Sequence, residues 1–284
     1  MKTSQFPPRL HVLLASEAPF GLIILRPSRQ KGDFHTCTIG WNRTDDSFKL
    51  GQWLKGKIYE QDCDLSPDGK HFLYFVAGYS GSWKQGDSQP YRIWTAVSRA
   101  PYLKALVFRG QMTTHCSGGR FEDNNRFWFN GENEGQTGLE DELEWIPQPP
   151  SKTVWAMEAD KLYDLRMRRG GWKARELAPS QRNVALWKKT RNAWTLEQFS
   201  HYYCESEHPI GRGPFWQWYR ASDNLSGETL GDQSWEWADF DNDRLVWAQG
   251  GKLFATPIWD GGHGDIIELA NFNDWKFTAV QAPY

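Results

Sequence analysis

Acidic residues are the first group in this sequence whose types and spacing could carry out chemistry. Two carboxyl groups about 5 to 10 Å apart can hydrolyse a glycosidic bond, one as acid and the other as base or nucleophile. Acids placed before a turn also commonly accept hydrogen bonds from turn amides, which is the structural alternative. The catalytic candidates, chosen because they occupy comparable points of a repeat described below, are Asp62, Asp64, Glu122, Glu236 and Asp239.

Histidine and cysteine come together in one short segment that contains His201, Cys204 and His208. Zinc takes three or four such nitrogen and sulfur ligands, so these residues are the metal-ligand candidates. Their spacing matches no zinc finger, zinc ribbon or His-Glu-x-x-His pattern. The sequence also has no phosphate-binding glycine loop and no Gly-x-Ser-x-Gly nucleophile turn. We therefore expect no metal and no other cofactor.

Tryptophan is frequent, with 17 among 284 residues. Aromatic side chains favour the half-buried surface of a strand, so we expect most tryptophans in the core. An exposed tryptophan can instead stack on a sugar or anchor a protein partner. Four tryptophans near expected loops or strand ends are the binding candidates: Trp41, Trp53, Trp83 and Trp94.

The charge balance excludes two classes of partner. With 33 basic and 35 acidic residues the net charge is −2, and both nucleic acids and anionic membranes require a basic excess. The first residues contain no apolar stretch of the kind found in signal peptides. The four cysteines (Cys37, Cys63, Cys116 and Cys204) are far apart, unlike the dense spacing of a disulfide scaffold. We therefore expect reduced thiols and a cytoplasmic location.

A repeated unit determines where the candidate residues lie. Residues 64–75 read as the end of one strand, a Ser-Pro-Asp-Gly-Lys turn and an aromatic strand. Further copies occupy residues 119–129 and 239–247, with weaker copies at 178–187 and 16–24. The equivalent points are Glu17, Asp68, Asp123, Ser180 and Asp241, which are separated by 51, 55, 57 and 61 residues.

Each interval has room for four short strands. In the second interval we expect strands at 71–76, 92–97 and 103–109, with residues 113–121 leading into the next turn. A four-stranded unit repeated at this spacing is typical of a β-propeller blade. One blade cannot bury both faces of its sheet alone, so the repeats must pack on one another in a closed ring. The sequence predicts an all-β protein built as a single propeller.

Five blades fit the intervals best, and six are the alternative. Residues 154–157 and 161–163 match residues 246–249 and 252–254, which lie 92 and 91 residues later, and two blades of 46 residues would explain that offset. We expect the chain termini to close the ring. A strand at 11–15 would combine with strands at 266–269 and 277–281, which removes two exposed sheet edges.

The turn and strand at 66–75, and less fully residues 239–247, resemble the blades of TolB-type and WD40-like propellers. The segments at 51–56 and 98–105 are similar to uncharacterised bacterial propeller-like proteins. These resemblances imply a propeller fold and a bacterial protein. They imply no activity.

The sequence favours a single domain over residues 1–284, with an acidic loop inserted near 131–150 that ends in Pro-Gln-Pro-Pro. Long irregular loops are often functional. We expect a non-enzymatic interaction module whose partner, another protein, docks on a loop face of the propeller. The alternative is a carbohydrate-active protein, a glycoside hydrolase or a lectin, with the acids arranged around a central channel. Enzymatic activity is left open by the residues themselves.

Overall fold

The computed structural model describes residues 6–26, 35–77, 93–111, 114, 117–131, 136–137, 142–147, 159–175, 184–201 and 216–284. The chain forms two compact units. The first consists of residues 1–11, 27–29 and 167–276, and the second of residues 12–26, 30–166 and 277–284. The prediction of a single domain stays a prediction.

The second unit contains three sheets. The first sheet has the order β1-β2-β3-β4, and β1 begins in the residues assigned to the first unit. Its strands are β1 (Arg9–Leu14), β2 (Phe20–Arg26), β3 (His35–Asn42) and β4 (Ser47–Lys55). The next sheet has the order β11-β8-β7-β6-β5, and the last has the order β12-β10-β9. Their strands are β5 (Asp64–Leu65), β6 (His71–Ala77), β7 (Ile93–Arg99), β8 (Ala105–Gln111), β9 (Gly119–Phe121), β10 (Arg126–Phe129), β11 (Gln136–Thr137) and β12 (Glu144–Trp145).

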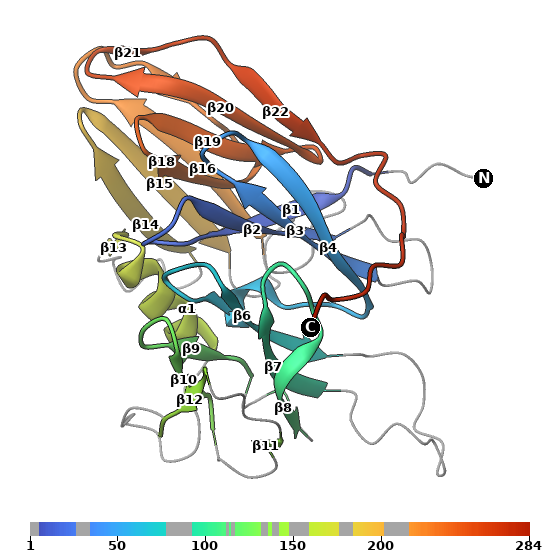
Figure 1. Ribbon diagram of the computed structural model, residues 1–284. Coiled ribbons are helices and arrows are strands. Elements are labelled where there is room, and N and C mark those ends of the chain that lie inside the picture. Colours follow the sequence, from blue (N-terminus) through green and yellow to red (C-terminus); the bar gives the residue numbers. More distant parts are fainter. Residues whose placement is uncertain are drawn as a thin grey trace. The chain divides into compact units, whose positions relative to one another are not determined.

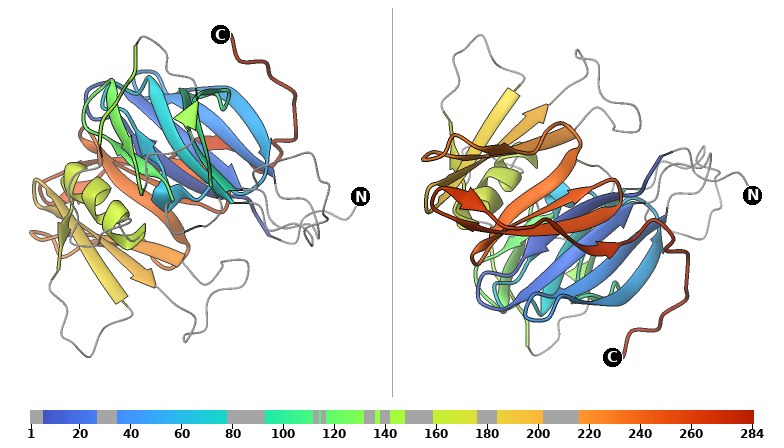
Figure 2. Two further views of the ribbon diagram at one scale, coloured as in Figure 1. Left: turned by 90° about the horizontal axis from the view of Figure 1, so that it is seen from below. Right: turned by 90° about the horizontal axis from the view of Figure 1, so that it is seen from above.

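The first unit contains two sheets. One has the order β13-β14-β15-β16-β17, and the other the order β18-β19-β20-β21 with β22 also pairing with β20. The strands are β13 (Lys173–Ala174), β14 (Val184–Arg191), β15 (Trp194–His201), β16 (Trp216–Asp223), β17 (Thr229–Leu230), β18 (Trp235–Asp241), β19 (Arg244–Gln249), β20 (Lys252–Trp259), β21 (Gly262–His263) and β22 (Ile267–Asn271). Figure 1 and Figure 2 show these strands as arrows coloured along the chain.

The predicted all-β class is confirmed, and the described residues form five sheets, as many as the repeats. The strands expected at 71–76, 92–97 and 103–109 correspond to β6, β7 and β8. The sheets have three to five strands rather than four throughout. Their pairing is antiparallel in the registers described, except that β10 and β12 are parallel.

A helix overturns the argument for six blades. Residues 161–163, matched above to strand residues 252–254, lie in helix α1 (Ala159–Arg169). Leu162, Tyr163 and Met167 are buried, and this spacing of apolar residues has the helical period. A short Lys-Leu-aromatic motif fits the face of a strand and of a helix, so the likeness was misleading.

The two terminal strand predictions had different outcomes. The strands expected at 11–15 and 266–269 correspond to β1 and β22. The strand expected at 277–281 is wrong, since these residues belong to no strand. Closure of a ring by the termini stays a prediction.

Parts of the acidic insertion pair with strands. Within residues 131–150, Gln136–Thr137 pairs with β8, and Glu144–Trp145 pairs with β10. Glu142 forms an ion pair with Arg99 at 2.6 Å. The described parts of this segment therefore extend two sheets. The remaining residues of the insertion lie outside those described.

Alternating side chains bury both faces of the sheet that contains β6. Phe72 and Tyr74 of β6 pack in one apolar cluster with Leu22 and Ile24 of β2. Leu73, on the opposite face, packs in another cluster with aromatic residues of β10. This follows from the period of two in a strand. The three sheets of the second unit therefore stack through their faces in chain order.

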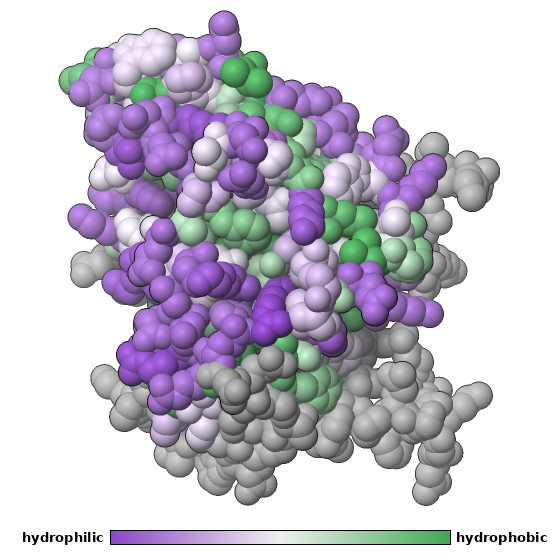
Figure 3. Space-filling model, viewed as in Figure 1, coloured by the Kyte–Doolittle hydropathy of each residue, from purple (hydrophilic) through white to green (hydrophobic). Residues whose placement is uncertain are grey.

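Most described tryptophans are core residues, as expected. Nine of the fifteen are buried: Trp41, Trp128, Trp172, Trp187, Trp194, Trp216, Trp235, Trp237 and Trp247. On the face shown in Figure 3, hydrophobic residues form separate areas among hydrophilic ones.

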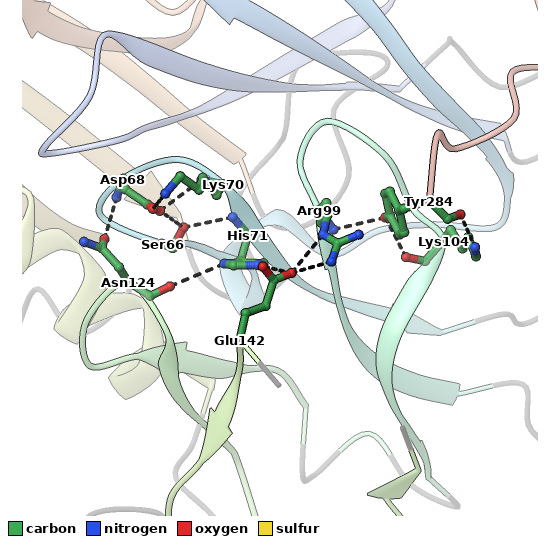
Figure 4. Close-up of polar contacts among 9 residues, drawn as sticks. All are labelled: Ser66, Asp68, Lys70, His71, Arg99, Lys104, Asn124, Glu142 and Tyr284. Carbon is green, nitrogen blue, oxygen red and sulfur yellow. Dashed lines mark hydrogen bonds and ion pairs between the residues drawn. The ribbon is translucent and has the colours of Figure 1, made fainter. Parts of the chain in front are cut away.

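The repeated turns of the second unit are bonded to one another. The Glu17 amide donates to the Pro67 carbonyl at 2.9 Å. The Asp68 amide donates to Oδ1 of Asn124 at 2.7 Å (Figure 4). Nδ2 of Asn124 donates to Glu17 Oε2 at 2.9 Å. Gly69, in the turn that contains Asp68, has a positive φ of 75°, which favours glycine. A Cβ at this position would lie 2.8 Å from Phe20. Turns equivalent in sequence thus meet in space.

Replacing Asn124 with alanine should lower the free energy of unfolding by about 1–3 kcal/mol, because the Asp68 amide loses its acceptor. Urea denaturation measures this. The matched control is Asn125→Ala, an exposed neighbour, for which the change should be within about 0.5 kcal/mol. Equal effects of the two substitutions would contradict the role given to Asn124.

Candidate functional site

Four of the five predicted acids accept hydrogen bonds that join strands or turns. Asp64 is buried and accepts the Phe121 amide at 2.9 Å, which links β5 to β9. Glu122 accepts the indole N–H of Trp128 at 2.8 Å. Both bonds lie within the second unit, and each ties a strand or turn to its neighbour.

The other two acids belong to the first unit. Glu236 Oε2 accepts the backbone amide of Leu10 at 2.9 Å. Asp239 accepts Lys189 Nζ and the Phe240 amide, both at 2.7 Å. The five acids therefore divide between the units, with Asp62, Asp64 and Glu122 in the second. Their convergence on a channel stays a prediction.

Asp62 lies outside any strand, whereas Asp64 belongs to β5. Asp62 ends a 3-10 turn, η1 (Glu60–Asp62), in which its amide donates to the Tyr59 carbonyl at 3.0 Å. The carboxyl group is nevertheless buried, with 6% of the residue exposed. Among the described residues, its Oδ1 has no hydrogen-bond partner.

Two arginines hold the backbone around this turn. Arg120 is buried and donates to the carbonyls of Gln61 and Cys63 at 3.2 Å, and to that of Leu162 in α1 at 2.9 Å. Arg166 of α1 donates to the carbonyls of Glu60 at 2.6 Å and Cys63 at 2.8 Å. The guanidinium groups thus bind buried or half-buried backbone carbonyls on both sides of the turn.

Burial raises the pKa of Asp62 from its usual value to about 6. Arg120, a hydrogen bond from Ser117, Arg166 and Lys57 oppose this shift but do not cancel it. A carboxyl group that titrates near neutrality is a candidate for proton transfer. Here its low exposure, and the use of Arg120 and Arg166 in binding backbone carbonyls, assign it to the interior instead.

The raised pKa makes stability depend on pH in a definite direction. Between the unfolded value of 3.8 and about 6, the folded protein binds the proton of Asp62 more tightly than the unfolded chain. The contribution of this group is therefore present at low pH and lost as pH rises through about 6.

From pH 7 to pH 5, wild-type protein should gain about 1 kcal/mol relative to Asp62→Asn, which cannot titrate. Denaturant unfolding of the two proteins across this range measures the difference. Parallel stability curves would show that Asp62 does not titrate there.

The structure places three of the four tryptophan candidates and rules out one of them. Trp41 is completely buried, its indole N–H donates to Asp46 at 3.0 Å, and it stacks on Phe48, so it is a core residue. Trp53 and Trp94 are half-buried, and their rings lie 6.3 Å from Phe277 and 6.4 Å from Phe108. Trp83 lies outside the described residues.

The metal candidates cannot be placed as a group. Cys204 and His208 lie outside the described residues, and only the backbone of His201, in β15, is described. Within the described ranges no three His, Cys, Asp or Glu side chains form a cluster suited to a metal.

Two of the four cysteines lie in the described part of the chain. Cys37 and Cys63 are free thiols, as expected, and burial raises the pKa of each to about 12. A thiol with such a pKa is a poor nucleophile at neutral pH, so both are core residues.

A surface that the sequence did not predict is formed by three turns of the first unit, residues 191–194, 223–228 and 259–263, here called the turn surface. Asn224 donates through its amide and through Nδ2 to the Ala193 carbonyl, at 2.9 and 2.7 Å. The Ala193 amide donates to Asp260 Oδ1 at 2.7 Å. The Trp194 indole donates to the Trp259 carbonyl at 2.9 Å. The three turns are therefore bonded to one another.

Further contacts fix the turn at residues 223–228. Asp223 accepts the Leu225 amide at 2.9 Å and the Ser226 hydroxyl at 3.0 Å. These bonds, with the Leu225 amide as the largest cause, lower the pKa of Asp223. Glu228 lies 3.0 Å from Nε2 of His263. A carboxylate held by turn amides is a strong local constraint.

Two large apolar side chains project from this fixed frame. Leu225 is 71% exposed and Trp259 is 51% exposed. Exposed Trp259 follows buried Ile258 at the end of β20, so strand alternation before the Asp-Gly-Gly turn is the signal that could have identified it. Leu225 follows an Asp-Asn turn and carries no comparable signal.

No helix in the described ranges is long and apolar enough to cross a membrane. No protein-family model matches the sequence, and neither does a curated protein. Among solved structures, the chain is similar to the β-propeller domain of the Trilobed protease from Pyrococcus furiosus, for which an open velcro topology is described. The match has 12% identity and a TM-score of 0.33, and it covers 94% of this chain and 99% of that domain.

Proposed function

We propose that this protein is a non-enzymatic binding module on a five-bladed propeller closed by its termini, and that a protein partner docks on the turn surface. The propeller part is supported by five sheets in chain order and by the face-to-face stacking of three of them. The bond from Leu10 of β1 to Glu236 of β18 also supports closure.

The observation that carries the docking proposal is the exposure of Leu225 and Trp259 on turns held by their neighbours. Large exposed apolar side chains in a fixed frame lose little conformational entropy on binding. Tryptophan is enriched among residues that dominate binding energy, and polar groups around it form the rim of an interface. Asn224, Asp260 and Glu228 supply that rim.

The acids support a non-enzymatic role. Four of the predicted acids accept hydrogen bonds that join strands and turns: Asp64, Glu122, Glu236 and Asp239. Their carboxylates therefore have a structural role. The interior position of Asp62 agrees with this.

Binding of a protein can be tested with a photo-crosslinking amino acid at position 225 in full-length protein expressed in its source organism. We expect one adduct with one partner protein. With that partner purified, Trp259→Ala should weaken affinity about 30-fold, the loss typical of a central binding residue. Ile266→Ala, an equally exposed residue outside the turns, is the matched control and should change affinity less than about twofold. Equal effects of the two substitutions would overturn the proposal.

Carbohydrate binding is the second candidate, favoured by the exposed Trp259 indole next to Asp260 in the same turn. Sugars stack on such rings while carboxylates and amides bind their hydroxyl groups. A glycan array that gives a signal with wild-type protein, but not with Trp259→Ala, would favour this function over a protein partner. A negative array would remove it.

A further inference from the structure

Residues 277–284, here called the closing segment, pack on the second unit as an extended chain outside any sheet. From Val280 onward alternate residues face inward, because Val280 and Tyr284 are half-buried and Ala282 is buried. The residues between them, Gln281 and Pro283, are exposed. This period of two is how proteins read extended peptides, with pockets for alternate side chains and hydrogen bonds to the main chain.

Gln52 of β4 binds the main chain of the closing segment through its side-chain amide. Its Oε1 accepts the amides of Leu103 and Lys104, at 2.7 and 3.0 Å. Because these two bonds fix the orientation of the side-chain amide, Nε2 is directed at the closing segment, where it donates to the Val280 carbonyl at 2.8 Å. This contact requires a peptide carbonyl and no particular side chain.

Both the hydroxyl group and the aromatic ring of Tyr284 make specific contacts. Its hydroxyl donates to the Lys104 carbonyl at 2.8 Å and accepts the Arg99 amide at 3.0 Å (Figure 4). Its ring lies 4.7 Å from the Arg99 guanidinium and meets Tyr102 edge-on at 6.2 Å. Phenylalanine would leave the amide and the carbonyl without this partner, so the site distinguishes tyrosine.

Glu142 fixes the position of Arg99, which contacts the Tyr284 ring. Glu142 accepts Arg99 Nε at 2.8 Å and its terminal nitrogen at 2.6 Å, and it lies 3.5 Å from Nε2 of buried His71 (Figure 4). Two bonds to one carboxylate fix the plane of the guanidinium. The surface that contacts Tyr284 therefore has its shape before any peptide arrives.

We infer that Gln52, Arg99, Tyr102, Leu103 and Lys104 form a binding site for an extended peptide of a partner protein, and that the closing segment is its intramolecular occupant. The occupant defines the ligand: an extended stretch with an apolar residue, a small residue two positions on and a tyrosine two positions after that.

A tethered occupant is present at high effective concentration, so a partner must match its chemistry closely to replace it. This site lies in the second unit and shares no residue with the turn surface of the first. The inference stands without the proposed function.

The test uses full-length protein carrying Ala282→Asp and Tyr284→Ala, which places a charge at a buried position of the closing segment and leaves the site itself unchanged. The probe is a fluorescein-labelled peptide of residues 274–284 with both ends blocked. Fluorescence anisotropy should show saturable binding to this variant and binding to wild type that is at least about 100-fold weaker, because there the site is filled. A probe with phenylalanine in place of tyrosine should bind about tenfold weaker.

Control variants locate the binding. In the same background, Gln52→Glu keeps the acceptor for Leu103 and Lys104 but removes the donor to the peptide, and it should weaken binding about tenfold. Trp259→Ala should leave it unchanged, which separates this result from a test of the turn surface. Absence of probe binding to a variant with an unchanged circular dichroism spectrum would overturn the inference. So would equal binding of a scrambled peptide, or a wild-type dimer that exchanges closing segments while the variant does not bind the probe.

Discussion

The side-chain amide of Asn124 is the contact on which the arrangement of the second unit depends. Its oxygen accepts the Asp68 amide and its nitrogen donates to Glu17, so one side chain joins turns that belong to three sheets. The apolar faces of these sheets supply most of the stabilisation, but burial of apolar area has no preferred direction. Hydrogen bonds do have one, and they restrict how far one sheet can slide on the next. The turns that recur along the sequence are therefore also the places where neighbouring sheets of the second unit are hydrogen-bonded to one another.

Near the three-stranded sheet of the second unit, buried charged side chains provide the directional hydrogen bonds between neighbouring elements. The sheet of β9, β10 and β12 has three strands and is followed by helix α1. Arg120 and Arg166 bond the carbonyls of η1 and, in the case of Arg120, one carbonyl of α1. Buried guanidinium groups need a nearby negative charge, and Asp62 supplies it. The raised pKa of Asp62 shows that burial outweighs this attraction. The ionised form of Asp62 therefore lowers the stability of the second unit at neutral pH. Its charge nevertheless accompanies the two arginines that connect η1, α1 and β9, where no regular strand supplies backbone amides.

Much of the fold could be predicted because its signals are local. The Ser-Pro-Asp-Gly turn with its aromatic strand identifies β6 without any knowledge of its partners, and the spacing of such turns gives the number of sheets. Helix α1 was missed because three residues of it match a strand motif, and the helical period becomes visible only over a longer window that ends at Met167. The site residues were harder to predict for a different reason. Exposure is a property of the assembled protein, so Trp41 and Trp259 cannot be told apart by residue type, and only the alternation along β20 separates them.

The path of the chain between the units has a consequence for biosynthesis. Leu10 is bonded to Glu236, 226 residues later, and Gln52 to Val280, 228 residues later. At roughly 5–20 residues per second, a ribosome delivers the second partner of each pair about 10–50 s after the first. Neither unit can complete its contacts before nearly the whole polypeptide has been made, and loops of this length close slowly. During that interval the apolar faces of sheets that have already been synthesised lack part of their packing partners.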